Sequence, residues 1–404
     1  GLLVAGACTP TEPDGPPPLL SELPRPLSGP ELRIVDGANA FAFDLLREAT
    51  RSLPSDSNAF LSPLSASMAL GMTLNGANGQ TWDDMRAALR LSDLSEAEIN
   101  AGYRDLIGLL RGLDSRTEMR IANSMWARLD LPLEQAFAEA GRSYFDADVS
   151  TLDFGSADAV PTINAWVSDR TNGRIPKLLD DIAPNEVLFL INAIYFKGKW
   201  RSAFDRGDTQ SEPFHGADGR DRTAFLMHQE NPLPFCLTDD FQAVDLLYGN
   251  GAFAMTVLLP TAGRTATGIL SGLDAVRWRS ITDCFSEADV ALALPRFRLD
   301  YGRRLKEDLE ALGMGIAFDR SQADLYRIAD VRPDRLYITR VDQKTFVEVN
   351  EEGTEAAAAT SVGVGTTSAP QVFTMRVDRP FVFAIRERLS GTVLFLGVMN
   401  VVGD

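Results

Sequence analysis

The sequence predicts an α+β fold, in which helices are concentrated early in the chain and strands late. Near the start of the chain, apolar residues recur at helical spacing. Later apolar stretches are continuous and of strand length. The two patterns do not alternate strand by helix and show no internal repeat, so a regular βαβ architecture is not expected.

Three helices are predicted in the early part of the chain. Apolar spacing predicts the first from about Gly37 to Thr50. Ser62 followed by Pro63 is typical of a second helix start, with Ser as the cap and Pro at the first helical position. A third helix is expected to begin at Thr81, which together with Asp84 resembles a capping box.

The predicted strands are apolar runs that end at prolines or turns. Three of them are too continuous for half-exposed strands, so we expect them to be buried on both faces. They cover residues 187–196, 252–259 and 290–294. Residues 381–385 and 393–398 flank a charged turn with Ser390 and Gly391, which predicts a hairpin.

The composition excludes several functional classes. The 404 residues include 39 Lys and Arg against 56 Asp and Glu, a formal net charge of −17, and 45 % are hydrophobic. A large core is therefore expected, and global disorder, a fibrous repeat and a polytopic membrane protein are excluded. Nucleic-acid binding needs a basic stripe, whereas the arginines here are scattered among carboxylates. No nucleic-acid partner is expected.

The chain lacks the residue patterns of a metal site or a hydrolase. Its three cysteines match no zinc motif, and we expect Cys236 and Cys284 to be two buried thiols rather than a disulfide. The only histidines are His215 and His228, and no Gly-x-Ser-x-Gly elbow occurs. We expect no metal, no cofactor and no enzymatic activity.

Residues 1–8, Gly-Leu-Leu-Val-Ala-Gly-Ala-Cys, are typical of the end of an export signal, because small residues follow an apolar stretch. Small residues before Cys8 also resemble a bacterial lipoprotein cleavage site, although Ala5 stands where such sites usually carry Leu. Two outcomes stay open: a lipid on Cys8, which would be the only membrane attachment, or a plain signal remnant. We expect an exported protein, either secreted or periplasmic, or lipid-anchored at the cell envelope.

Residues 9–30 form a proline-rich segment between this signal and the folded body. Eight prolines within it block helices and sheet ladders. We therefore expect a disordered tether over residues 9–30 and a single domain over residues 31–404.

A long segment near the C-terminus joins two predicted strands. The alternation from Thr345 to Val349 predicts a strand, and order is expected again only at Arg379. Loops of this length are usually functional or disordered. By composition, residues 354–359 could form an exposed helical turn. As a strand, however, the face that begins with Thr354 carries no charge, so it could enter a sheet without burying an ion.

These residues carry a family resemblance. The segment Glu351-Glu-Gly-Thr-Glu-Ala-Ala-Ala-Ala resembles the hinge of the reactive-centre loop of serpins. Four further segments resemble family motifs in the family's order: the first helix, the shutter, the breach and the C-terminal signature. They are residues 39–43, 58–70, 192–200, and 378–383 with 395–398. The resemblance implies helices packed on three β-sheets with an exposed reactive-centre loop at about residues 351–378.

The resemblance also implies site residues. The hinge is Glu351, Gly353, Thr354, Glu355, Ala356, Ala357, Ala358 and Ala359, and the shutter and breach include Ser62, Ser65, Asn192, Trp200 and Gln343. The family's spacing places the reactive bond at Thr367–Ser368, with Thr366–Thr367 as the near alternative. A small, uncharged residue before the bond suits elastase-like or subtilisin-like proteases rather than trypsin-like ones.

The activity implied by the resemblance is suicide inhibition of a serine protease. The protease forms an acyl-enzyme with the loop, and the cut loop then inserts into the central sheet as a strand. The partner is then a serine protease held covalently, and we expect a monomer that needs no cofactor. The alternative is a non-inhibitory serpin-fold protein with a binding or chaperone-like role, although the small hinge residues disfavour it.

One shutter residue departs from the family pattern. Eight residues before Glu351, where the family usually has His, this chain has Gln343. Gln can donate and accept hydrogen bonds but cannot titrate. We therefore do not expect the shutter to respond to pH, whereas Gln343 can still hold it closed through hydrogen bonds.

Overall fold

The computed structural model describes residues 17–354 and 371–403. Its helices are α1 Gly29–Thr50, α2 Pro63–Leu74, α3 Gly79–Ala88, α4 Glu96–Arg111, α5 Gln135–Phe145, α6 Ala159–Arg170, α7 Ala266–Ser271, α8 Ala275–Cys284, α9 Lys306–Leu309 and α10 Gly315–Phe318. Its strands are β1 Ala59–Leu61, β2 Glu118–Arg128, β3 Ala147–Leu152, β4 Leu188–Lys199, β5 Gln210–His215, β6 Asp221–Leu237, β7 Phe241–Leu247, β8 Phe253–Pro260, β9 Ser286–Pro295, β10 Phe297–Arg304, β11 Asp342–Asn350, β12 Gly353–Thr354, β13 Phe373–Arg376, β14 Phe381–Glu387 and β15 Val393–Met399.

Helices packed on sheets confirm the predicted α+β fold. One sheet has six strands in the order β10-β11-β12-β4-β2-β3. The other strands form a nine-stranded network, in the order β1-β15-β14-β8-β7-β6-β9-β13 with β5 on β6. The three expected sheets appear as two networks because the 17-residue β6 pairs with β7 at one end and with β9 along most of its length.

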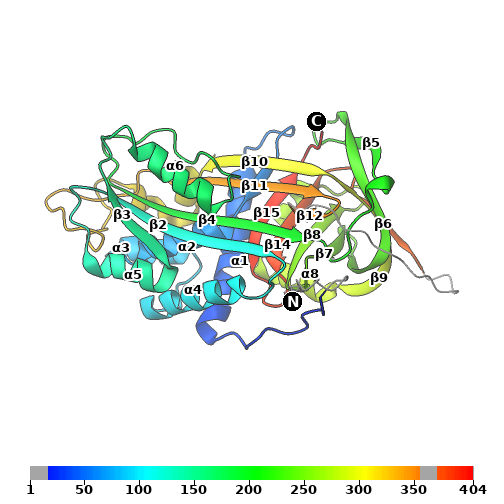
Figure 1. Cartoon of the computed structure of the whole chain (residues 1–404), viewed down its shortest axis with the longest axis horizontal. Helices are drawn as coiled ribbons and strands as arrows, with labels where there is room; N and C mark the ends of the chain where they lie inside the picture. The colour runs from blue at the N-terminus through cyan, green and yellow to red at the C-terminus, as the bar shows by residue number, and fades with distance from the viewer. Residues whose placement is uncertain (1–16, 355–370, 404) are drawn as a thin grey trace, which may run out of the picture.

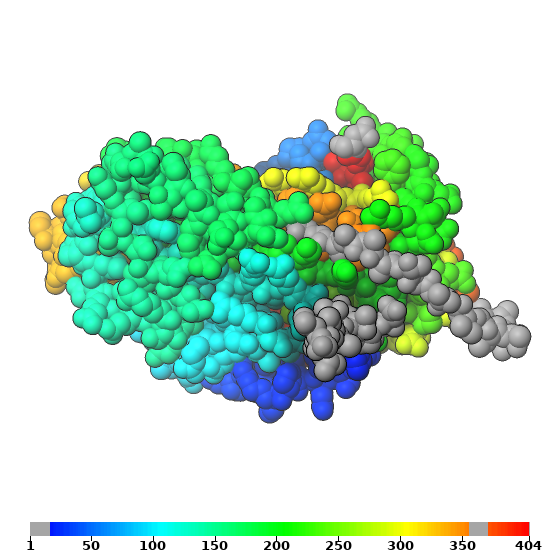
Figure 2. Space-filling model, viewed as in Figure 1, coloured from blue at the N-terminus to red at the C-terminus, as the bar shows by residue number. Residues whose placement is uncertain are grey.

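The central helix α2 lies between the two networks, in contact with both β4 and β15. It is apolar on all sides and almost fully buried, as expected for a helix with sheet on two faces. Helix α6 crosses the outer face of β2 and β4, where Ile163 and Val167 pack on Phe189 and Ile191 (Figure 1). Beyond α6, strands β10 and β11 reach the molecular surface (Figure 2).

The predicted helices are present, with corrections at their starts. Helix α1 begins eight residues before Gly37, since Ser28 and Glu31 form a capping box that fixes its first turn. Pro63 opens α2 as predicted, but the Ser62 hydroxyl donates to Leu394 O instead of capping the helix. Helix α3 begins at Gly79, so the capping role predicted for Thr81 is wrong. The Thr81 hydroxyl accepts from Asp324 N instead.

The predicted strands lie in β4, β8, β9 and the β14–β15 hairpin. Strand β8 is buried along its whole length, as predicted. Residues 290–294 of β9 are buried except for the half-buried Ala291, as predicted. Burial on both faces is wrong for the first half of β4, where Leu188, Leu190 and Asn192 are only half-buried. The cause is that no described strand pairs with this half of β4 on its β12 side.

The proline-rich segment is docked from residue 17 onward, which corrects the expected tether for residues 17–30. Leu20 N donates to Asn250 O at 2.8 Å, and Arg201 donates to Pro17 O at 2.6 Å. Arg25 forms a bidentate ion pair with the buried Glu31. These partners satisfy backbone groups that the prolines leave without a ladder.

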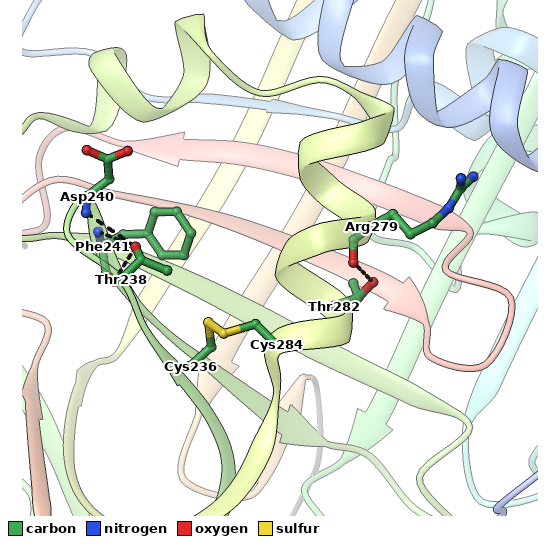
Figure 3. Close-up of a disulfide and its surroundings, with 7 residues drawn as sticks. All are labelled: Cys236, Thr238, Asp240, Phe241, Arg279, Thr282 and Cys284. Carbon is green, nitrogen blue, oxygen red and sulfur yellow. Dashed lines mark hydrogen bonds between the residues drawn. A yellow bond between two sulfur atoms is a disulfide. The ribbon is translucent and has the colours of Figure 1, made fainter.

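Cys236 and Cys284 form a disulfide, which corrects the prediction of two buried thiols (Figure 3). Cys236 near the end of β6 is buried, whereas Cys284 at the end of α8 is exposed. Their Cα atoms are 5.6 Å apart, although 48 positions separate them in the sequence. The packing of α8 against β6 makes this pair, which spacing alone does not indicate.

Replacing Cys236 by Ala and Cys284 by Ser is expected to lower the free energy of unfolding. Closing a loop of 48 residues contributes about 4 kcal/mol through the entropy of the unfolded chain. Urea unfolding of wild type and double variant measures the difference, and a reductant should destabilise only the wild type. Rapid alkylation of both thiols in the folded protein would contradict the pairing.

Candidate functional site

The two-residue strand β12 lies between β11 and β4 at one end of the six-stranded sheet. Thr354 pairs with Val349 on one side and with Gly198 on the other. Gly353 has φ +145°, and a Cβ there would lie 2.1 Å from Gly198 O. Only glycine fits this approach. The structure thus corrects the expected loop boundary: residues 351–354 are buried in the body, and Thr354 is already inside the sheet.

Beyond β12, no described residue fills the space between β11 and β4. A cavity of about 140 Å³ lies there, lined by β4, by the chain leading into β11 and by α2. Leu188, Leu190 and Asn192 of β4 border this cavity and are only half-buried, although their side of β4 faces the core. The sheet therefore has a strand position directly in line with β12 that none of the described residues occupies.

A chain of side-chain contacts holds β12 in place. The Thr354 hydroxyl and the Tyr248 hydroxyl are 2.7 Å apart, and both residues are buried. Tyr248 stacks on Trp200 with ring centroids 4.5 Å apart, and the Trp200 indole N–H donates to Asn350 O. Burial raises the pKa of Tyr248 far above its usual range, so its hydroxyl keeps its proton.

The turn before β12 is fixed by ion pairs. The buried Glu351 carboxylate accepts from Arg296 Nε and from the Thr209 hydroxyl, each at 2.5 Å. Glu352 pairs with Arg206 and accepts from Trp200 N through its carbonyl. Burial would raise the pKa of Glu351, but the hydrogen bonds from Arg296 and Thr209 outweigh it and lower that pKa below 4.5.

Glu351 is expected to make the stability of the intact protein depend on acid pH. Its pKa is lowered on folding, so its contribution is fully present above the ordinary value of 4.5 and is lost as pH falls through the folded value. At pH 7, Glu351→Gln should lower the free energy of unfolding by about 1.5 kcal/mol or more, the size of a charged hydrogen bond. Thermal unfolding at pH 7 and pH 3 should show a smaller difference between the two proteins at pH 3. An equal difference at both pH values would contradict this role.

The shutter residues form two separate contacts, both to the start of α2. The Gln343 amide accepts from Ser62 N at 3.0 Å and donates to Ser62 O at 2.8 Å. Across the cavity, the Ser65 hydroxyl donates to Asn192 O at 3.2 Å. The structure thus brings Gln343 and Ser62 together, and Ser65 and Asn192 together, with α2 as the link between β11 and β4.

Asn192 has a second role and one unmet hydrogen-bond requirement. Its amide donates to Asn123 Oδ1 on β2 at 2.6 Å, while its own buried Oδ1 has no partner among the described residues. An acceptor left unpaired beside the cavity costs free energy in the intact state. It is available to any group that later fills the strand position.

Gln343→Met is expected to weaken the closed shutter. The thioether keeps the length of the side chain but leaves the buried Ser62 N–H without an acceptor, at a cost of about 1–3 kcal/mol. Ser62 O keeps a bond from Ala66 N, so the loss is confined to one group. The urea midpoint of the intact protein measures it. Lys344→Met on the opposite face is the control, and an equal shift in both variants would contradict the prediction.

Several predicted site residues lie outside the described residues. They are Cys8, Glu355, Ala356, Ala357, Ala358, Ala359, Thr367 and Ser368. The chain is described again from residue 371, and β13 then runs parallel to β9. Sequence reasoning missed Tyr248, Arg296 and Thr209. Each lies at least 55 positions from its hinge partner, and no motif marks them.

No helix among the described residues is long and apolar enough to span a membrane. Within the same ranges, no group of His, Cys, Asp or Glu side chains is placed to hold a metal ion.

Comparison with known proteins agrees with this geometry. The family model described as serpin (serine protease inhibitor) matches residues 36–401. An uncharacterised serpin-like protein of Thermococcus kodakarensis is 33 % identical over 379 residues, covering 92 % of this chain and 86 % of the relative. Leukocyte elastase inhibitor of Bos taurus is 33 % identical over 372 residues, covering 89 % and 97 %.

Solved structures show the same arrangement. The native state of tengpin, a thermophilic serpin, superposes with a TM-score of 0.84 at 28 % identity, covering 96 % of this chain and 97 % of tengpin. Human thyroxine-binding globulin, in complex with its ligand, also gives 0.84 at 25 % identity, covering 93 % and 100 %. The chain belongs to the serpin family. The family is named for serine protease inhibition, and thyroxine-binding globulin shows that its fold also serves ligand binding.

Proposed function

We propose that this serpin is a suicide-substrate inhibitor of a serine protease with elastase-like or subtilisin-like specificity. The observation that carries the proposal is β12, a two-residue strand that already occupies the head of a strand position between β11 and β4, the rest of which no described residue fills. A strand begun in this register extends by adding the residues that follow Thr354, in sequence order. Cleavage of the loop would free these residues to enter the sheet.

The hinge composition supports insertion in that direction. From Thr354 the alternating face continues through small or β-branched uncharged residues, and the charge at Glu355 falls on the opposite face. Filling the position would bury Leu188 and Leu190 and supply ladder hydrogen bonds. These gains provide the driving force for a movement that traps an acyl-enzyme.

The specificity is supported by the residues at the expected reactive bond and by one relative. Thr367 before the bond is small and uncharged, which suits a shallow pocket. Leukocyte elastase inhibitor is among the relatives at 33 % identity. The covalent complex, the monomeric state and export, with or without a lipid on Cys8, belong to the proposal. The export signal rests on residues 1–8 alone.

Mixing the protein with an elastase or a subtilisin is expected to give a covalent complex that survives boiling in SDS. The released C-terminal peptide should begin at Ser368. Mass spectrometry of that peptide fixes the bond. Digestion of the loop by proteases that stay active would reject inhibition and favour the non-inhibitory binding function.

In the same assay, Thr354→Arg should convert the inhibitor into a substrate. An arginine at this buried position lacks a carboxylate partner, so it disfavours β12 and the strand that would extend it. Acylation is unaffected, but each 1.4 kcal/mol added to the insertion barrier shifts the partition about tenfold toward release of active protease. Thr354→Ser keeps the hydroxyl bonded to Tyr248 and should inhibit like wild type. Undiminished inhibition by the Arg variant would mean that the loop does not insert through this hinge.

A further inference from the structure

A second cavity lies far from the hinge in the sequence, between the end of α1, the start of α7 and the chain entering β14. Its volume is about 540 Å³, within the range of small-molecule sites in proteins. Buried Leu270, Ala266 and Val398 line it together with Leu53 and Pro380. These side chains give the cavity an apolar floor that no described residue covers.

Three arginines also line this cavity, namely Arg51, Arg264 and Arg379, and no Asp or Glu is among its lining residues. Such a local excess of cations is unexpected in a chain whose net charge is −17. The three come from separate segments: the residue after α1, the loop before α7 and the residue before Pro380. The tertiary fold therefore gathers them around one concave surface.

Each guanidinium has an acidic partner outside the cavity but uses only part of its donors. Arg51 pairs through Nη2 with Glu48 at 2.8 Å, and Arg264 pairs through Nε with Asp240 at 3.1 Å. Arg379 uses Nη1 on Asp378 and Nη2 on Pro260 O. The remaining N–H groups, including both Nη atoms of Arg264, have no partner among the described residues.

We propose that this cavity binds a small organic monocarboxylate with an apolar body. The guanidinium N–H groups would hold the carboxylate in the planar geometry that suits both groups, while Leu53, Leu270 and Val398 receive the apolar part. Glu48, Asp240 and Asp378 offset only part of the charge of the three arginines, because Asp240 also pairs with Arg277 and Asp378 also pairs with Arg376. The positive charge that remains at the cavity is therefore small. A monoanion is therefore favoured over a phosphate dianion, and the overall charge of −17 disfavours polyanions.

Isothermal titration of the full-length protein with naphthalene-2-carboxylate tests the site, and naphthalene-2-carboxamide is the neutral control of the same shape. We expect the carboxylate to bind at least about tenfold more tightly, because only it accepts charge-assisted hydrogen bonds. Equal affinities, or no binding of the carboxylate at millimolar concentration, would overturn the proposal.

The chain provides a matched pair of variants for this titration. Arg264 and Arg277 both pair with Asp240, but only Arg264 lines the cavity. Arg264→Gln should weaken carboxylate binding about fivefold or more, whereas Arg277→Gln should change it less than about twofold. Equal losses in both variants would mean that net charge, not the cavity, governs binding.

A third variant tests the location without touching a charge. Thr267 is exposed on α7 and lines the cavity, so Thr267→Trp should fill it without disturbing the core. It should abolish binding of both probes while the thermal unfolding midpoint stays within about 2 °C of wild type. Unchanged binding in Thr267→Trp would place the ligand elsewhere, for example in the cavity beside β4, and would overturn the proposal.

Discussion

The pairing of β12 with both β11 and β4 is the contact on which the state of the central sheet depends. Gly353 and Thr354 close the sheet at one end, and the strand position directly beyond them is occupied by none of the described residues. Each backbone hydrogen bond of the ladder contributes only about 1 kcal/mol net to stability. A strand of two residues is therefore weakly held by its backbone alone. Its side-chain partners therefore decide how firmly the sheet stays closed.

Those partners come from three connections that are otherwise unrelated. Tyr248 follows β7, Arg296 lies between β9 and β10, and Thr209 precedes β5. Tyr248 contacts Thr354, and both Arg296 and Thr209 contact Glu351, so all three hold the hinge. Withdrawing β12 from the sheet would break these contacts together, and breaking the Arg296–Glu351 pair would be costly because it leaves a charge poorly solvated.

The hinge and the shutter are expected to respond differently to pH. At the hinge, the hydrogen bonds to Glu351 hold its pKa below the ordinary value, so acid weakens the closed state there. At the shutter, Gln343 holds Ser62 through an amide that does not titrate. Gln343 thus holds Ser62 through a group that does not titrate, and the pH dependence predicted for the intact protein comes from Glu351 at the hinge.

The sequence by itself determined the α+β class, the positions of six of the fifteen strands in the described residues, the family and the uncharged face of the hinge, because periodicity, caps and motif order are properties of neighbouring residues. It also indicated that Gln343 could replace a shutter His. Only the tertiary structure decided that Thr354 is already inside the sheet, that Cys236 pairs with Cys284, that residues 17–28 are docked and that Tyr248 and Arg296 hold the hinge. Each of these depends on which distant segments pack together. Contacts between distant segments produce no periodicity or motif among neighbouring residues, so the sequence alone does not indicate them.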